Sequence, residues 1–168
     1  MGRQKGPSAG EELLRRFYAA FAAADGAGMT ACYTDDATFS DPVYPGLDGP
    51  EVGAMWRMLM ARARDLRIEL EEVHADDAGG RATWTAHYAF GPDRRPVANR
   101  VRSTFELREG RIRGQHDVFD FHGWAAMAFG LPGRLLGWTP WFRARVQREA
   151  AQQLRAFRAV EDAAPPAS

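Results

Sequence analysis

The chain is short of cysteine and has no excess of either charge. Cys32 is the only cysteine, which excludes an intramolecular disulfide and a cysteine-based zinc site. Lys and Arg number 22 together, as do Asp and Glu, so no overall field favours nucleic acid or acidic ligands. A Gly-rich phosphate loop is also missing, because Gly79-Gly80 is typical of a plain hairpin turn.

The first residues do not have the pattern of a signal peptide, and the apolar stretches of the sequence are interrupted. Residues 1–10 are polar and Gly-rich without the apolar core of a signal peptide, so we expect a disordered lead and a cytoplasmic protein. Residues 123–142 are strongly apolar, but glycines and prolines divide them into short helices, which argues against a membrane span. Residues 163–168 are predicted to be a frayed tail.

What is present predicts one domain that begins with three helices. Residues 11–24 place apolar side chains at spacings of three and four, which is typical of an amphipathic helix. Residues 28–33 predict a second, short helix. Pro50 suits a first helical turn, so a third helix is expected to run to about Ala63.

From Leu66 the apolar period changes to two. This predicts strands over about 66–75, 81–90, 97–108 and 112–121, joined by tight turns. The order of elements predicts an α+β fold, in which three N-terminal helices cover a cone-shaped, curved antiparallel sheet over residues 11–122.

A shorter strand before the third helix carries a carboxylate on its apolar side. Asp41 shares the face of Phe39 in a two-residue repeat, so its side chain is expected to point inward until Pro42 ends the strand. An apolar environment raises the pKa of a carboxyl group and suits it to proton transfer. The alternative is that Asp41 caps the turn before Pro42.

Other polar residues lie on the predicted inner faces, where they need a partner or a function. Asp117 shares its face with Phe119, and two inward carboxylates would raise each other's pKa, an arrangement typical of acid–base chemistry. Alternatively, Asp117 pairs with Arg57 or Arg113. The remaining polar side chains on these faces are Tyr18, Tyr88, Asn99 and Ser103.

The stretch Asp35-Asp36-Ala37-Thr38-Phe39-Ser40-Asp41-Pro42, with the glycines and amphipathic helix that follow, resembles the ketosteroid isomerase branch of the nuclear transport factor 2-like superfamily. That superfamily includes SnoaL-like polyketide cyclases and limonene epoxide hydrolases. The resemblance covers residues 11–122 and implies that Asp41 is a general base. Residues 115–120 resemble the last strand of the epoxide hydrolases, which implies that Asp117 activates water. A homodimer is also implied.

The departures from these families narrow the expected reaction. The isomerases use a Tyr and an Asp as oxyanion donors, at positions that hold Phe17 and Ser103 here. Three of four further positions used by the epoxide hydrolases lack the required chemistry, because they hold Phe39, Trp84 and Ala86. Both classical steroid isomerisation and standard limonene epoxide hydrolysis are therefore disfavoured.

The sequence predicts a cofactor-independent isomerase, cyclase or hydrolase that acts on a small apolar substrate. Asp41 and Asp117 are the predicted catalytic residues, and no metal or cofactor is expected. The alternative is a non-catalytic module that binds a small molecule. The residues expected to contact the ligand are Tyr18, Trp56, Trp84, Tyr88, Asn99, Ser103 and Phe119.

Residues 123–162 form a predicted helical extension beyond the resemblance. Residues 123–138 are interpreted as a lid over the cone, and an Arg-rich helix from Pro140 to about Val160 as an arm. Two alternatives are extra core packing and, less favoured, docking on a membrane surface through tryptophans next to arginines. His116 could join Asp120 or His122 around a metal, but the alternation places all three on the outer face.

Overall fold

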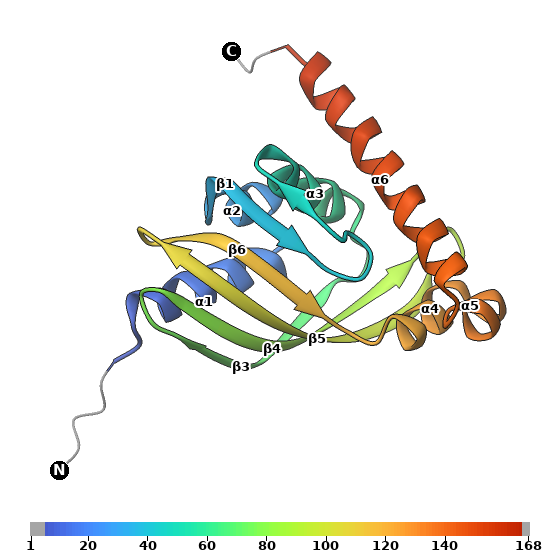
Figure 1. Cartoon of the computed structure of the whole chain (residues 1–168), viewed down its shortest axis with the longest axis horizontal. Coiled ribbons are helices and arrows are strands. Elements are labelled where there is room, and N and C mark those ends of the chain that lie inside the picture. The colour runs from blue at the N-terminus through green and yellow to red at the C-terminus, as the bar shows by residue number, and fades with distance from the viewer. Residues whose placement is uncertain (1–5, 166–168) are drawn as a thin grey trace.

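A computed structural model describes residues 6–165, which form one curved sheet with helices on its concave side and at one end (Figure 1). The helices are α1 (Ala9–Ala22), α2 (Gly26–Ala31), α3 (Pro50–Arg62), α4 (Phe121–Phe129), α5 (Leu131–Leu136) and α6 (Pro140–Ala163). The strands are β1 (Tyr33–Ser40), β2 (Leu47–Asp48), β3 (Arg67–Ala75), β4 (Gly79–Phe90), β5 (Arg95–Arg108) and β6 (Arg111–Val118).

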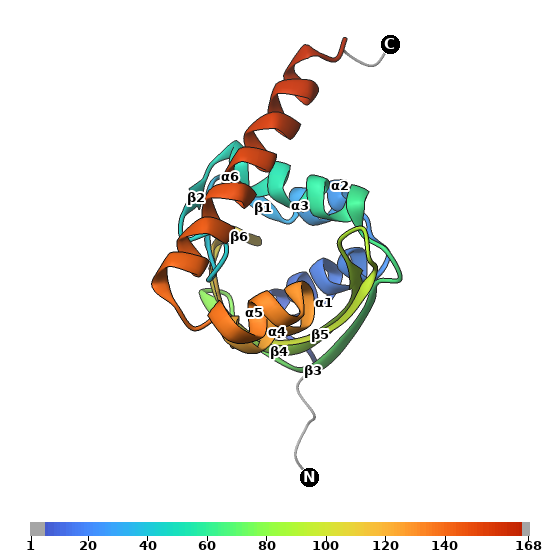
Figure 2. The same ribbon diagram turned by 90° about the vertical axis from the view of Figure 1, so that its right-hand side faces the viewer.

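The strands follow the order β2-β1-β6-β5-β4-β3 in a sheet that curves without closing. Figure 2 shows α1 on the concave side and α3 across the open side, so the predicted α+β cone is confirmed. The sheet is not antiparallel throughout, because β1 pairs with β6 in parallel. A hairpin fixes antiparallel pairing, but four strands and α3 separate β1 from β6 in the sequence, and so long a connection permits a parallel pair.

The start of α1 is fixed by Ser8. Its hydroxyl accepts a hydrogen bond from the Glu11 backbone N–H (3.0 Å) and donates one to the Ala75 carbonyl (2.6 Å). The helix therefore begins at Ala9, inside the stretch predicted as a disordered lead. Residues 1–5 of that lead and 166–168 of the predicted tail lie outside the described residues.

Aromatic rings fill the space between α1, α3 and the sheet. Phe17 is fully buried, and its ring meets those of Tyr18, Tyr33 and Trp56 edge-to-face at centroid distances of 5.2–5.7 Å. A second apolar cluster lies where α4 and α6 cover the end of the sheet. It contains Val97, Phe121, Trp124, Ala125, Ala128, Phe142 and Val146.

The last strand ends earlier than its two-residue period predicts. β6 stops at Val118, and Phe121 is the first residue of α4 rather than a strand residue. Asp120 accepts a hydrogen bond from the Gly123 backbone N–H (3.1 Å), so this N-cap starts a helix where the alternation alone predicted a longer strand.

The helix α6 returns from this end of the sheet to lie along α3. Arg57 of α3 forms a two-pronged ion pair with Glu161 of α6, at 2.7 and 2.9 Å. In the middle of α6, the side chain of Leu154 packs in the main core. In the chain from residue 6 to residue 165, no helix is both long and apolar enough to cross a bilayer.

Candidate active site

Asp41 lies in the turn that follows β1. Its Oδ1 accepts hydrogen bonds from the backbone N–H groups of Val43 (2.7 Å) and Tyr44 (2.6 Å), and its own N–H donates to the Tyr44 carbonyl (2.8 Å). The prediction that Asp41 is a strand residue is therefore wrong, and the turn-capping alternative is observed. The strand cannot continue because Pro42 has no N–H to donate.

The Asp41 carboxyl group is nevertheless partly enclosed. Loss of solvent raises its pKa from an ordinary 3.8 to about 6, although the hydrogen bonds from Tyr44 and Val43 and the charge of His116 act in the opposite direction. A capping carboxylate in water would have a lowered pKa. Asp41 thus caps a turn and also has a pKa raised toward neutral pH.

Asp117 is buried on β6, directly opposite Ser103 of β5, with 3% of its surface exposed. Gln115 Nε2 donates to both carboxylate oxygens, at 3.0 and 3.2 Å. Burial raises the pKa of Asp117 to about 7, hydrogen bonds from Ser103 and Gln115 lower it, and the charge of Asp41 raises it. The charge of Asp41 therefore reaches Asp117 and makes its ionisation less favourable.

An ion pair does not explain the burial of Asp117. Arg57 binds Glu161, and Arg113 lies 3.3 Å from Asp36 on the outer side of the sheet. The alternative in which Asp117 pairs with one of these arginines is therefore wrong. Neutral donors surround Asp117 instead, which leaves its charge only partly compensated.

These neutral donors form a chain of hydrogen bonds across the core. Trp56 Nε1 donates to the Tyr33 hydroxyl (2.8 Å), which donates to Gln115 Oε1. The amide of Gln115 is thereby oriented with its NH₂ group toward Asp117.

On the other side of Asp117, Ser103 Oγ accepts from Trp84 Nε1 (2.8 Å) and from the Tyr18 hydroxyl (3.3 Å). With both acceptor positions used, the Ser103 hydroxyl proton is free for Asp117. Burial raises the pKa of Tyr18 well above its ordinary value, so Tyr18 stays a donor. The predicted contact residues Tyr18, Trp84 and Ser103 thus meet around Asp117.

Tyr88 and Phe119, two further predicted contact residues, lie at the end covered by α4, whereas Trp56 packs in the main core. The Tyr88 hydroxyl accepts from Trp124 Nε1 (2.8 Å), and burial together with the Asp41 charge raises its pKa to about 12. Phe119 is half-buried and packs against the Trp124 ring. Asn99 is half-buried opposite Ala86, between the two apolar clusters.

The hollows on the surface do not coincide with these carboxylates. Two of these hollows lie between β1 and β2 and at α4, where the lining includes Arg95, Asp120, His122 and Arg134. Neither of the two is lined by Asp41 or Asp117. Aromatic rings pack in the interior beside the carboxylates, with Phe39 against Trp56 and Tyr18 against Trp84.

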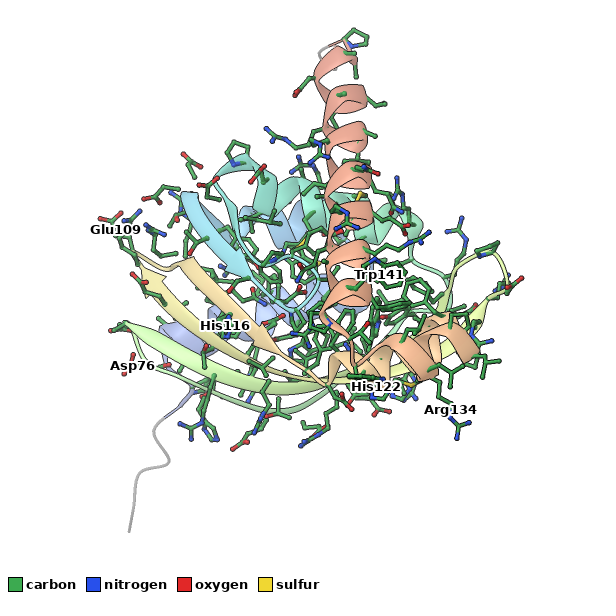
Figure 3. The ribbon with its side chains drawn as sticks, turned by 45° about the vertical axis from the view of Figure 1, so that its right-hand side comes forward. Asp76, Glu109, His116, His122, Arg134 and Trp141 are labelled. Atoms are coloured by element: carbon green, nitrogen blue, oxygen red, sulfur yellow. The ribbon has the colours of Figure 1, made fainter. Side chains whose placement is uncertain are left out.

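The histidine group predicted as a weak metal site lies on the outside. His116 Nδ1 is 2.7 Å from Ser40 Oγ, and His122 Nε2 is 2.9 Å from the Arg134 carbonyl (Figure 3). Over residues 6–165 no three His, Cys, Asp or Glu side chains are grouped so as to hold a metal ion.

Two members of the network were missed by the sequence reasoning. Gln115 shares the parity of Asp117 on β6, and Tyr33 shares the parity of Phe39 on β1. Parity was thus a usable signal for both. The sequence prediction places Tyr33 at the end of a short helix over residues 28–33, and it treats Gln115 only as part of the stretch 115–120 that resembles the epoxide hydrolases.

Comparisons with known proteins agree with this architecture. A family model described as a SnoaL-like domain matches residues 14–115. No curated protein matches the chain significantly. The described network lies mostly within the matched range, and Asp117 follows just after it.

Solved structures share the fold at low sequence identity. A Mycobacterium tuberculosis epoxide hydrolase of the LEH-like type is 21% identical over 76% of this chain and 96% of its own, with a TM-score of 0.62. A hypothetical protein with a ketosteroid isomerase-like fold from Catenulispora acidiphila, solved in complex with trimethylamine, is 16% identical over 77% of this chain and 98% of its own, with a TM-score of 0.64. An NTF2-like protein of unknown function from Burkholderia pseudomallei is 19% identical over 72% of this chain and 98% of its own, with a TM-score of 0.64.

Proposed function

The chain belongs to the SnoaL-like domain family, and from this premise we propose that it is a cofactor-independent acid–base enzyme acting on a small apolar substrate. An isomerase, cyclase or hydrolase of a polyketide, terpenoid or steroid-like molecule fits this description. One observation carries the proposal: two enclosed carboxyl groups lie in the same core, where burial raises the pKa of Asp41 to about 6 and that of Asp117 to about 7, and the charge of Asp41 contributes to the rise at Asp117. Carboxyl groups tuned to neutral pH are the requirement for proton transfer at that pH.

The two carboxyl groups differ in what they can do. Both backbone hydrogen bonds of Asp41 end on Oδ1, so Oδ2 is free to take a proton from a substrate carbon or from water. Both oxygens of Asp117 accept from Gln115, and its higher pKa favours the protonated form. Asp41 is thus the general base, and Asp117 is its acid partner.

Tyr88 supplies a donor near the base. Its hydroxyl accepts from Trp124, which leaves the Tyr88 proton for a substrate oxygen close to Asp41. A single neutral hydroxyl stabilises a developing oxyanion less than the paired donors of the steroid isomerases. The proposed reaction is therefore one with modest demand for oxyanion stabilisation.

Access to the carboxylates requires a movement at the end covered by α4 and α6. Gln147 of α6 donates to the Pro42 carbonyl (3.1 Å), next to Asp41, and Trp124 of α4 donates to Tyr88. These two hydrogen bonds join the covering helices to the proposed site. Opening them would admit a substrate, and reclosing would exclude water from the reaction.

The test is the substitution Asp41→Asn, assayed with three probes: 5-nitrobenzisoxazole for proton abstraction, styrene oxide for ring opening and androst-5-ene-3,17-dione for isomerisation. The amide keeps Oδ1 for Val43 and Tyr44 and removes a poorly solvated charge, so we expect an unchanged or raised melting temperature and a loss of about 10²- to 10⁴-fold in turnover of any probe that reacts. The wild-type rate should rise with pH through about 6.

Asp48→Asn is the matched control, because Asp48 is an exposed carboxylate on the neighbouring β2. It should leave turnover unchanged. Turnover that survives Asp41→Asn would contradict the assignment of the base.

The second candidate is a binding module of the same fold. It is favoured by the closed interior, where aromatic rings lie beside both carboxylates and neither surface hollow reaches them. Saturable binding of the probes, measured by calorimetry, without turnover by the wild-type protein would select this candidate. The fold alone does not distinguish the enzyme from the binding module, because the same fold supports many functions.

A further inference from the structure

Among the described residues, most of the exposed large apolar side chains lie at one end, apart from Val118 and Val160. We call α5–α6 patch the group formed by Leu131, Leu135, Leu136, Trp138 and Trp141, in α5, the turn after it and the start of α6. Trp138 and Trp141 are 70% and 58% exposed, whereas the other three tryptophans are buried in the two clusters. Exposed apolar groups of this kind mark a surface that meets a partner.

The charge around the α5–α6 patch is mostly positive. Residues 121–148 contain four arginines and no Asp or Glu, although the whole chain is neutral; Asp120 and Glu149 flank this stretch, and Glu149 pairs with Arg145 at 3.4 Å. All four arginines, Arg134, Arg143, Arg145 and Arg148, are exposed. Figure 3 shows Arg134 pointing away from the body of the molecule at this end. Any attraction for anions is therefore local to the patch.

Arginines and aromatic rings are also interleaved within the patch. The Arg145 guanidinium lies 6.0 Å from the centre of the Trp141 ring, and the Trp138 indole N–H is bonded only to the Leu135 carbonyl of its own turn (3.0 Å). Both indole rings stay largely exposed and therefore keep apolar area for contact with another surface. Membrane interfaces select this combination of indole rings and cationic side chains.

We propose that the α5–α6 patch docks this protein on an anionic membrane surface. The tryptophans and leucines enter the headgroup region, while the four arginines bind lipid phosphates. A second copy of the chain is a poorer occupant, because a two-fold contact would bring the arginines of both copies together. The attachment is peripheral, since none of the helices between residues 6 and 165 can span the bilayer.

Docking by this end has a geometric consequence. The patch shares α6 with Gln147, which is bonded to the Pro42 carbonyl, and it adjoins α4, whose Trp124 is bonded to Tyr88. The covered end of the cone would then face the bilayer, where apolar molecules concentrate. The docking itself stands on the patch alone and does not depend on the proposed reaction.

The test is co-sedimentation of the full chain with phosphatidylcholine–phosphatidylglycerol vesicles and with pure phosphatidylcholine vesicles, at low salt and at ~0.5 M salt. We expect binding only to the anionic vesicles, and its loss at high salt. Trp138 and Trp141 report contact directly, because the other tryptophans are already buried. Their emission should shift to the blue and become protected from acrylamide on binding.

Two paired variants separate the contributions. Arg134→Gln with Arg148→Gln should weaken binding roughly 25-fold, since each arginine near the surface contributes about fivefold. Trp138→Ala with Trp141→Ala should weaken it on the order of tenfold or more. Arg81→Gln with Arg102→Gln removes the same charge from the exposed face of the sheet and should change nothing. Circular dichroism should show all variants folded, because every substituted side chain is exposed.

Four outcomes would overturn the proposal. They are no binding to anionic vesicles at low salt, equal binding to neutral vesicles, an equal loss in the Arg81→Gln, Arg102→Gln control, and retention of binding in both patch variants. Sedimentation velocity without lipid adds a fifth: a dimer that the tryptophan variant dissociates would assign the patch to contact between copies.

Discussion

Two carboxyl groups of similar acidity are held in different ways. The Asp41 carboxyl group is held by backbone N–H groups of its own turn. Asp117 is held by side chains from other elements, through Gln115 and then Tyr33 and Trp56. A change remote in sequence should therefore displace Asp117 more readily than Asp41.

Tyr33→Phe tests this dependence. Removing the hydroxyl leaves Trp56 Nε1 and Gln115 Oε1 without a partner in the core, so we expect a loss of about 1–3 kcal/mol in the free energy of unfolding. Urea denaturation measures it. Tyr44→Phe is the control, because Tyr44 is equally buried and no hydrogen bond of its hydroxyl is observed. An equal loss in both variants would show that the Tyr33 hydroxyl has no special role.

For single residues, the alternation of apolar and polar side chains along the strands predicted which side chains point inward, but not which hydrogen bonds they form. Asp117 and Ser103 were predicted to point inward, and they face each other across β5 and β6. The environment of Asp41 was predicted from a strand that ends one residue before it. A side chain that caps a turn gains two backbone donors, and this local gain is invisible to a two-residue period.

Among the elements, α6 joins the two apolar clusters. Phe142 and Val146 belong to the cluster at the end of the sheet, and Leu154 belongs to the main core. Its far end is attached to α3 by the Arg57–Glu161 ion pair. The predicted arm is therefore packed on the domain along most of its length.

Leu154→Ala tests whether that packing stabilises the domain. Leu154 is 3% exposed, so we expect a loss of about 2–5 kcal/mol in the free energy of unfolding from the lost burial and the remaining cavity. Val160→Ala, on the same helix but 72% exposed, should change it by less than about 0.5 kcal/mol. A small loss at Leu154 would mean that α6 is only loosely attached.

The sequence predicted the hairpins of this fold better than its long-range pairings. β3 to β6 follow one another through tight turns, and their period of two is clear. The parallel contact of β1 with β6 joins residues more than seventy positions apart, and no local pattern specifies it. The position of α6 on α3 was open for the same reason.

Over the whole molecule, the carboxyl groups fall into two sets with opposite effects on stability. Burial raises the pKa of Asp41 and Asp117, so the stability that they contribute is present below their unfolded pKa and is lost as pH rises to about 7. Hydrogen bonds and ion pairs on the surface lower the pKa of the second set, whose contribution is lost as pH falls below about 4. These residues are Asp36, Glu69, Glu71, Asp76 and Glu161.

The two sets together predict a maximum of stability at acidic rather than neutral pH. We expect the free energy of unfolding, measured by urea denaturation between pH 3 and pH 9, to be highest near about pH 4–5 and to fall until about pH 7. Asp117 carries up to about 4 kcal/mol of this fall, at about 1.4 kcal/mol for each pKa unit, because it is almost fully buried. Asp117→Asn should therefore flatten the fall and raise stability at pH 8, whereas Asp48→Asn should leave the profile unchanged. If wild-type stability instead rose steadily from pH 4 to pH 8, the Asp117 carboxyl group would be ionised in the folded protein at no cost, and its role as an acid would be refuted.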